Sequence, residues 1–117
     1  MKWGRHLPFE EIQDRLADAA TPYVTLFEQA GEAGIEVRYY ALTESDPQRP
    51  HGRDELYLVI SGSGTFRLGE VRRPFAPGDL IHVPAHTHHR FEAFTGRVET
   101  WVIFFGERNE PSDAPTS

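Results

Sequence analysis

Residues 55–70 read ELYLVISGSGTFRLGE, a run of strand-forming residues interrupted by two glycine-containing turns. The part from Glu55 to Ser61 is rich in β-branched and aromatic side chains, which predicts a strand. Gly62-Ser63-Gly64 then predicts a turn into a second strand, Thr65–Leu68, and Gly69-Glu70 predicts the next turn. Two short strands joined by so few residues predict an antiparallel hairpin.

The same pattern of short strands and turns continues on both sides of this stretch. Turns are predicted at Pro77-Gly78-Asp79 and Thr95-Gly96. Further strands are predicted at Tyr23–Phe27, Ile35–Tyr40, Leu80–Val83, His89–Phe94 and Val98–Phe105. Helical spacing of apolar residues appears only between Phe9 and Ala20, before Pro22. The sequence therefore predicts an all-β sandwich or barrel preceded by a short helix.

Length and composition are those of a single globular domain. The chain has 117 residues, of which 38% are hydrophobic and 26% charged. We expect one domain over residues 1–108, with the helix at about 9–20 and the barrel at about 23–106. Residues 109–117 lack a large apolar side chain and are expected to form a disordered tail.

The charge and the cysteine count exclude several classes of function. Eighteen acidic residues against 12 basic ones give a net charge of −6. The sequence has no stripe of basic residues, so we expect no nucleic-acid partner. No apolar stretch approaches the roughly 20 residues of a membrane span, and no leader peptide is visible, so we expect a cytoplasmic protein without membrane contact. Because the chain has no cysteine, a bound metal would need histidine or carboxylate ligands.

Two segments rich in histidine, HGRDE (51–55) and HTHH (86–89), each open a predicted strand. Residues two or four apart on a strand lie on the same face, so His51 and Glu55 can face one interior. In the second segment, alternation with the apolar residues that follow places His89 inward and the preceding histidine outward.

Two imidazoles and one carboxylate on facing strands could cap a divalent ion such as Fe, Mn, Ni, Co or Zn. Such an arrangement leaves coordination positions open for water or a small molecule. The residues alone also allow a plainer interpretation, in which the histidines form a polar surface loop and the carboxylate lies on a solvated edge. Spacing alone leaves both alternatives open.

The chain resembles small single-domain bacterial cupins of unassigned activity through two motifs. The first is carried by PHGRDELYLVISG (50–62) and the second by GDLIHVPAHTHH (78–89). The resemblance implies a cupin double-stranded β-helix, a jelly-roll barrel that holds its ligands in the interior. It also implies one divalent metal ion bound by His51, Glu55 and His89.

The sequence departs from the family pattern at several motif positions. Arg49 stands where the family has its first histidine, His86 replaces a glycine and Ala93 replaces the closing asparagine. An arginine cannot ligate a metal, so the usual set of three histidines and one glutamate is reduced to three ligands. Gln48, His82 or His86 could complete the shell, and a pocket without metal is the alternative.

Four residues near the motifs are candidates for substrate contact: Gln48, Arg49, Tyr57 and His82. Arg49 and Arg53 flank His51, and a guanidinium group suits an anionic substrate. Both arginines could instead point to solvent or pair with Asp46 or Asp54. For the tyrosine, core packing is the alternative, and for the histidine a satisfied buried or interface position.

Three functions are compatible with these observations. The first is a metal-dependent enzyme, a dioxygenase or isomerase, acting on a small organic molecule inside the barrel. The second is a non-catalytic module that binds a small molecule or a metal, for example as a sensor. The third is an interaction protein that keeps the fold without metal. The resemblance and the need to cover sheet edges also lead us to expect a homodimer.

Overall fold

The computed structural model describes residues 4–29, 34–43, 46, 50–94 and 96–106. Its elements in chain order are α1 (Phe9–Asp18), β1 (Tyr23–Gln29), β2 (Ile35–Leu42), β3 (Asp54–Ser61), β4 (Gly64–Leu68), β5 (Val71–Phe75), β6 (Leu80–Val83), β7 (His89–Glu92) and β8 (Val98–Phe105). The predicted all-β class with one short N-terminal helix is confirmed. Gln48, Arg49 and the predicted tail at 109–117 lie outside the described residues.

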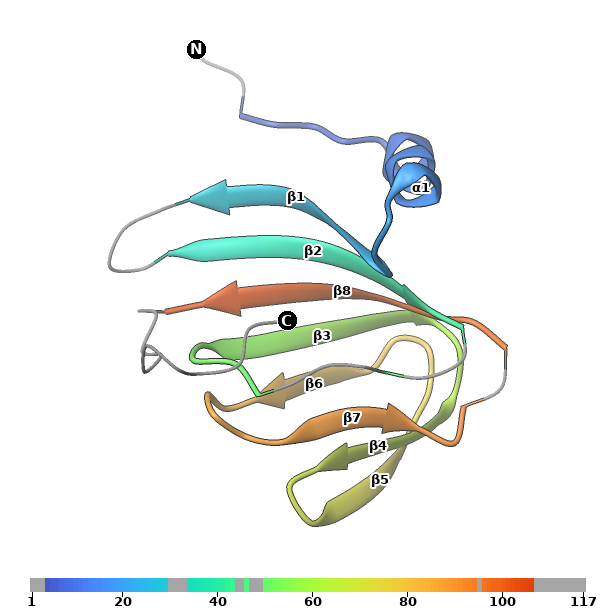
Figure 1. The fold of residues 1–117 in the computed structure, drawn as a ribbon, viewed down its shortest axis with the longest axis vertical. Helices are drawn as coiled ribbons and strands as arrows, with labels where there is room; N and C mark the ends of the chain where they lie inside the picture. The colour runs from blue at the N-terminus through green and yellow to red at the C-terminus, as the bar shows by residue number, and fades with distance from the viewer. Residues whose placement is uncertain (1–3, 30–33, 44–45, 47–49, 95, 107–117) are drawn as a thin grey trace.

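The strands form two antiparallel sheets. One has five strands in the order β1-β2-β8-β3-β6, and the other has three in the order β5-β4-β7. Figure 1 shows the larger sheet crossing the picture, with β7, β4 and β5 beneath it. Neighbours in each sheet are often distant in sequence, as where β2 and β3 both pair with β8. This arrangement matches the expected double-stranded β-helix.

The predicted hairpin between β3 and β4 is wrong. The two strands belong to different sheets, and the turn at Gly62 carries the chain from one sheet to the other. Gly62 has φ +94°, and a Cβ there would lie 2.9 Å from Arg97 O, so glycine is required. The actual hairpin joins β4 to β5 through Gly69-Glu70, with Leu68 opposite Val71. Strand β5 was not among the predicted strands.

Helix α1 packs on the outer face of the five-stranded sheet. Its buried residues Ile12 and Leu16 join Leu26 and Tyr39 in a small apolar cluster. The helix ends at Asp18, two residues before the predicted end, because the chain becomes extended ahead of Pro22. No helix in the described part of the chain is long and apolar enough to span a membrane.

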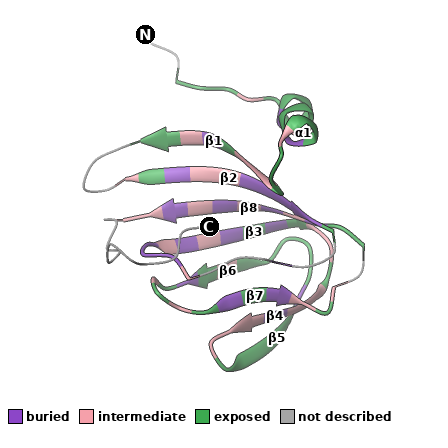
Figure 2. Ribbon diagram, in the orientation of Figure 1, coloured by how far each residue is buried: buried purple, intermediate pink, exposed green. Residues whose placement is uncertain are grey.

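The main core fills the space between the two sheets. Its members are Tyr40, Leu42, Tyr57, Val59, Phe66, Phe75, Phe91, Val83, Val98, Val102 and Phe104. Figure 2 shows that buried positions concentrate on β2, β8, β3 and β7, while β5 is largely exposed. The inner face is not uniformly apolar, because Glu36 and Glu55 lie opposite the same residue of β8, Phe104. The ionisable residues therefore gather at one end of the interior.

Candidate metal centre

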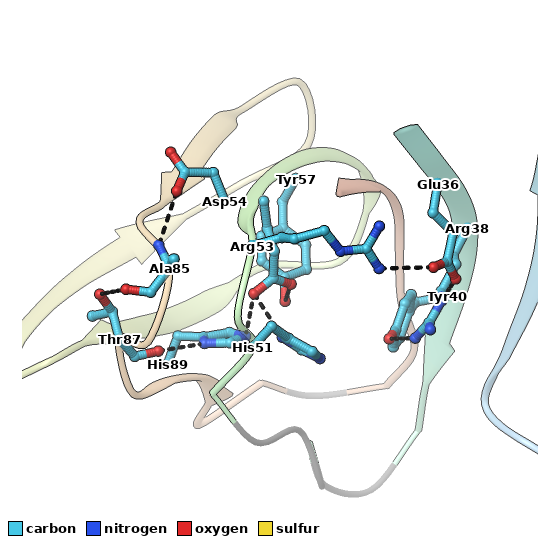
Figure 3. Close-up of polar contacts among 11 residues, drawn as sticks. Glu36, Arg38, Tyr40, His51, Arg53, Asp54, Tyr57, Ala85, Thr87 and His89 are labelled. Atoms are coloured by element: carbon cyan, nitrogen blue, oxygen red, sulfur yellow. Dashed lines mark hydrogen bonds and ion pairs between the residues drawn. The ribbon is translucent and has the colours of Figure 1, made fainter. Parts of the chain in front are cut away.

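Three side chains predicted as metal ligands converge inside the barrel. One ligand atom from each of His51, Glu55 and His89 lies within 4.8 Å of the others, and all three residues are buried. Glu55 comes from β3, His89 opens β7, and His51 precedes β3 (Figure 3). Two sheets thus supply the three side chains, which fixes their relative positions.

The hydrogen bonds of His89 reveal which ring nitrogen is available for a ligand. Its Nδ1 lies 2.9 Å from the carbonyl oxygen of Thr87, which can only accept, so Nδ1 carries the proton. In a neutral imidazole, Nε2 then presents a lone pair. This atom is buried without a hydrogen-bond partner among the described residues and lies 3.2 Å from Glu55 Oε2. Two lone pairs at that distance repel unless a cation or a proton lies between them.

Glu55 links the other members of the site. Its Oε2 lies 2.8 Å from Nδ1 of His51, and its Oε1 accepts a hydrogen bond of 3.2 Å from the Tyr57 hydroxyl. The backbone of His51 is tied to the loop before β7, because its carbonyl accepts from the amide of His86 at 2.6 Å. The carboxylate and the first histidine are thus held by contacts outside the ligand set.

Strand alternation explains why these particular residues reach the interior. On β7, His89 and Phe91 are buried while Arg90 is exposed, and His88 just before the strand is also exposed. The predicted inward orientation of His89 is therefore confirmed. His51 differs from the expectation in one respect, because β3 begins only at Asp54 and the histidine lies ahead of the bend at Gly52-Arg53 that leads into the strand.

The structure brings one further predicted residue to the site and keeps two away. Tyr57 is buried beside Glu55, where it also belongs to the core. His82 lies on the other face of its strand, half exposed, with Nε2 at 3.0 Å from Asp54 Oδ2. His86 is exposed. The position of His82 comes from alternation on β6, where Val83 faces the core instead.

The alternatives weighed for Arg53 did not include its actual partner. The residue is 8% exposed, and its Nη2 donates to Glu36 Oε1 at 2.9 Å. The expectation that it points to solvent or pairs with Asp46 or Asp54 is wrong. Its side chain is drawn toward β2, where Glu36 offers a buried carboxylate.

Sequence reasoning missed the polar residues that β2 contributes to the interior. The Glu36 carboxylate accepts hydrogen bonds from Arg53 Nη2 and from Arg38 Nε (Figure 3). Arg38 Nη1 in turn donates to the Tyr40 hydroxyl at 3.0 Å. Burial alone would raise the pKa of Glu36, but the hydrogen bonds from the two arginines outweigh it and hold that pKa below its ordinary value. The sequence did carry a signal that both faces of β2 are covered, because Tyr39 and Tyr40 are consecutive aromatic residues.

The arrangement can serve as a compact binding centre for a divalent ion. Two neutral imidazoles and one carboxylate are ligands suited to Fe(II), Mn, Ni, Co or Zn, and three protein ligands leave positions for water or substrate. The buried lone pair on His89 Nε2 and the adjacent carboxylate oxygen fit such an ion by their chemistry.

Comparison with known proteins agrees with this fold. The model of the cupin domain family matches residues 37–104. An uncharacterised protein of Streptomyces coelicolor is 33% identical over 75 residues, which are 62% of this chain and 71% of the relative.

Solved structures share the architecture at lower sequence identity. A cupin 2 conserved barrel domain protein from Salinispora arenicola superposes with a TM-score of 0.64 at 17% identity, covering 89% of this chain and 88% of the other. The DMSP lyase DddQ from Ruegeria pomeroyi superposes with a TM-score of 0.63 at 19% identity, covering 81% of this chain and 48% of that protein. The match of the family model, the shared barrel and the two sequence motifs establish that the chain belongs to the cupin family.

Proposed function

We propose that this cupin binds one divalent transition-metal ion through His51, Glu55 and His89 and acts as a metal-dependent enzyme on a small organic molecule inside the barrel. A bound ion of this kind supplies Lewis-acid chemistry or, if it is iron, a site for dioxygen. The similarity to a protein described as a lyase supports an enzymatic role only as an analogy of fold.

One observation carries the proposal: Nε2 of His89 is buried, has no hydrogen-bond partner among the described residues, and faces Glu55 Oε2 at 3.2 Å. Leaving a buried polar atom unpaired costs about 1–3 kcal/mol. A protonated ring would form an ion pair with Glu55, whereas a neutral ring leaves two acceptors facing each other. A cation between the nitrogen and the carboxylate would satisfy both atoms at once.

The protein residues have separate tasks in this proposal. Thr87 holds the His89 ring through Nδ1, so that Nε2 stays deprotonated and aimed at the site. Tyr57 orients the Glu55 carboxylate through its hydroxyl. The surrounding apolar side chains, including Phe104, keep water scarce and make the ligand interactions stronger.

Metal stoichiometry tests the binding step. Protein purified without a histidine tag is loaded separately with Fe(II), Mn(II), Co(II), Ni(II) and Zn(II), desalted, and analysed by mass spectrometry for metal content. We expect about one ion per chain with at least one of these metals. We also expect almost none after His51→Ala or Glu55→Gln, because each change removes one of only three ligands.

His82→Ala is the matched control, since this histidine is half exposed and lies on the opposite face of the sheet. It is expected to retain the metal. Wild-type protein without stoichiometric metal, or a loss caused by His82→Ala alone, would overturn the assignment. Oxygen consumption by the Fe(II) form with a panel of small organic acids then separates an oxygenase from a non-catalytic binding module.

A further inference from the structure

A second polar group lies inside the barrel beside the proposed metal ligands. Arg38 and Arg53, here called the arginine pair, both donate to the carboxylate of Glu36. All three side chains are largely buried, with exposures of 12%, 9% and 6%. Arg38 and Glu36 come from the inner face of β2, and Arg53 lies just ahead of β3.

The arginine pair carries more charge than its partner neutralises. The lowered pKa of Glu36 keeps that carboxylate ionised at neutral pH, so two guanidinium groups share one negative charge. Nε of Arg53 is also buried without a hydrogen-bond partner among the described residues. Asp46, another buried carboxylate, accepts from the amide of Phe91 on β7. A buried N–H donor without an acceptor is costly, so Nε of Arg53 favours an additional acceptor such as a carboxylate oxygen.

The arginine pair and the metal ligands border the same aromatic ring. The Cζ atoms of Arg38 and Arg53 lie 4.8 and 5.1 Å from the centre of the Phe104 ring. The His51 ring contacts the same ring edge-on at 4.8 Å. The arginine pair and the metal ligands are therefore neighbours in the interior, and Figure 3 shows Arg53 and His51 in the same close-up.

We propose that the arginine pair receives the carboxylate of a small organic acid whose remaining atoms lie at the metal centre. This proposal rests on the proposed function, for which it names small organic acids as the substrate class. A guanidinium fork matches a carboxylate through two parallel hydrogen bonds, which an ammonium group cannot reproduce. The ion pair with Glu36 leaves Nε of Arg53 without an acceptor, and the carboxylate of a bound acid would supply one.

The test measures the binding of matched acids and amides by titration calorimetry. The probes are acetate, succinate and benzoate, each compared with its amide, on metal-loaded and on metal-free protein. We expect at least one acid to bind ten-fold or more tightly than its amide. We expect Arg53→Met to weaken that acid by ten-fold or more while the amide and the metal content stay unchanged.

Two variants keep the test informative if Arg53→Met folds poorly. Arg53→Lys retains the charge but not the fork and is expected to weaken the acid by an intermediate factor. Arg38→Gln is expected to weaken binding of the acid, as Arg53→Met does. Arg90→Met is the matched control, because Arg90 is exposed on β7 and should leave acid binding unchanged. Circular dichroism identifies the folded variants.

Equal binding of acids and amides, or full acid affinity in folded arginine variants, would overturn the inference. Failure of the metal proposal is visible separately, because metal content is measured on the same samples. Acid binding that depends on Arg53 in the metal-free protein, with no metal taken up by any sample, would support the arginine pair and contradict the metal centre.

Discussion

The two ends of the barrel interior are built from the same strands but differ in chemistry. At one end Glu36, Phe104 and Glu55 lie side by side on β2, β8 and β3. At the other end Leu42 lies opposite Val98, and both belong to the apolar core. The polar end holds buried carboxylates, arginines and histidines, whereas the apolar end holds aliphatic and aromatic side chains.

The difference separates stability from function. Burial of apolar surface stabilises a fold by about 25 cal/mol per Å², whereas buried ionisable groups lose their hydration and are retained only where they are paired or used. The polar end carries the two buried side-chain atoms found without a hydrogen-bond partner among the described residues, Arg53 Nε and His89 Nε2. Both atoms lie where we propose a ligand and a metal ion.

The largest effect on stability is expected at the apolar end. Phe75→Ala removes a ring that is 3% exposed and contacts Phe91 at 5.0 Å between centroids. We expect the free energy of unfolding to fall by about 3–5 kcal/mol, as for other buried aromatic residues. Metal content should stay at the wild-type value. Urea unfolding and metal analysis check both statements, and loss of metal from folded protein would show that the two ends are not independent.

Metal binding should stabilise the polar end specifically. At a free metal concentration one hundred times Kd, binding to the native state alone raises the free energy of unfolding by about 2.7 kcal/mol. We expect this increase in the wild type and its absence in Glu55→Gln, which lacks the bridging carboxylate. Thermal unfolding with and without added metal measures it. An equal increase in the variant would place the stabilising ion elsewhere.

The arginine pair predicts how stability depends on pH. Because the pKa of Glu36 is lowered from 4.5 by its arginine partners in the folded state, its ionised form stabilises the protein above that pH. Glu36→Gln should lower the free energy of unfolding by about 1–3 kcal/mol at neutral pH. The difference in free energy of unfolding between the wild type and this variant should become smaller as the pH falls below 4.5 and through the lower pKa of Glu36 in the folded state. Denaturant titrations between neutral and acid pH check this, and a gap that widens in acid would contradict it.

The smallest expected effect concerns backbone strain at the polar end. His86 has φ 63°, in the left-handed region, at the position where its family motif carries glycine. Its amide holds the carbonyl of His51. We expect His86→Gly to raise the free energy of unfolding by about 0.5–1 kcal/mol, since relief of the strain exceeds the entropy cost of glycine. Thermal unfolding measures the change, and marked destabilisation would mean that the imidazole itself is structural.

The sequence predicted the features that are set by neighbouring residues, namely strand alternation and the positions of turns. Alternation placed His89 inward, and the glycine and proline signals located most turns. Strand β5 was missed because its sequence, VRRPF, combines two arginines with a proline, which are tolerated on its exposed edge position. The change of sheet at Gly62 was missed because a turn signal does not reveal whether the next strand pairs with the previous one.

The partners of the candidate site depended on contacts between distant segments. The pairing of Arg53 with Glu36 joins residues 17 apart through two strands that both flank β8. No short-range spacing contains that information. The three proposed ligands were accessible from sequence because each lies in one of two short motifs, while the arginine pair has no motif.

The central claim is that His51, Glu55 and His89 converge on one ion, and a crystal structure of metal-loaded protein tests it most directly. We predict an anomalous difference peak at about 2.0–2.2 Å from a ring nitrogen of each histidine and from a carboxylate oxygen. A peak centred instead on the exposed histidines His82 or His88, or an interior without anomalous signal in protein soaked with each of the five metals, would contradict the account.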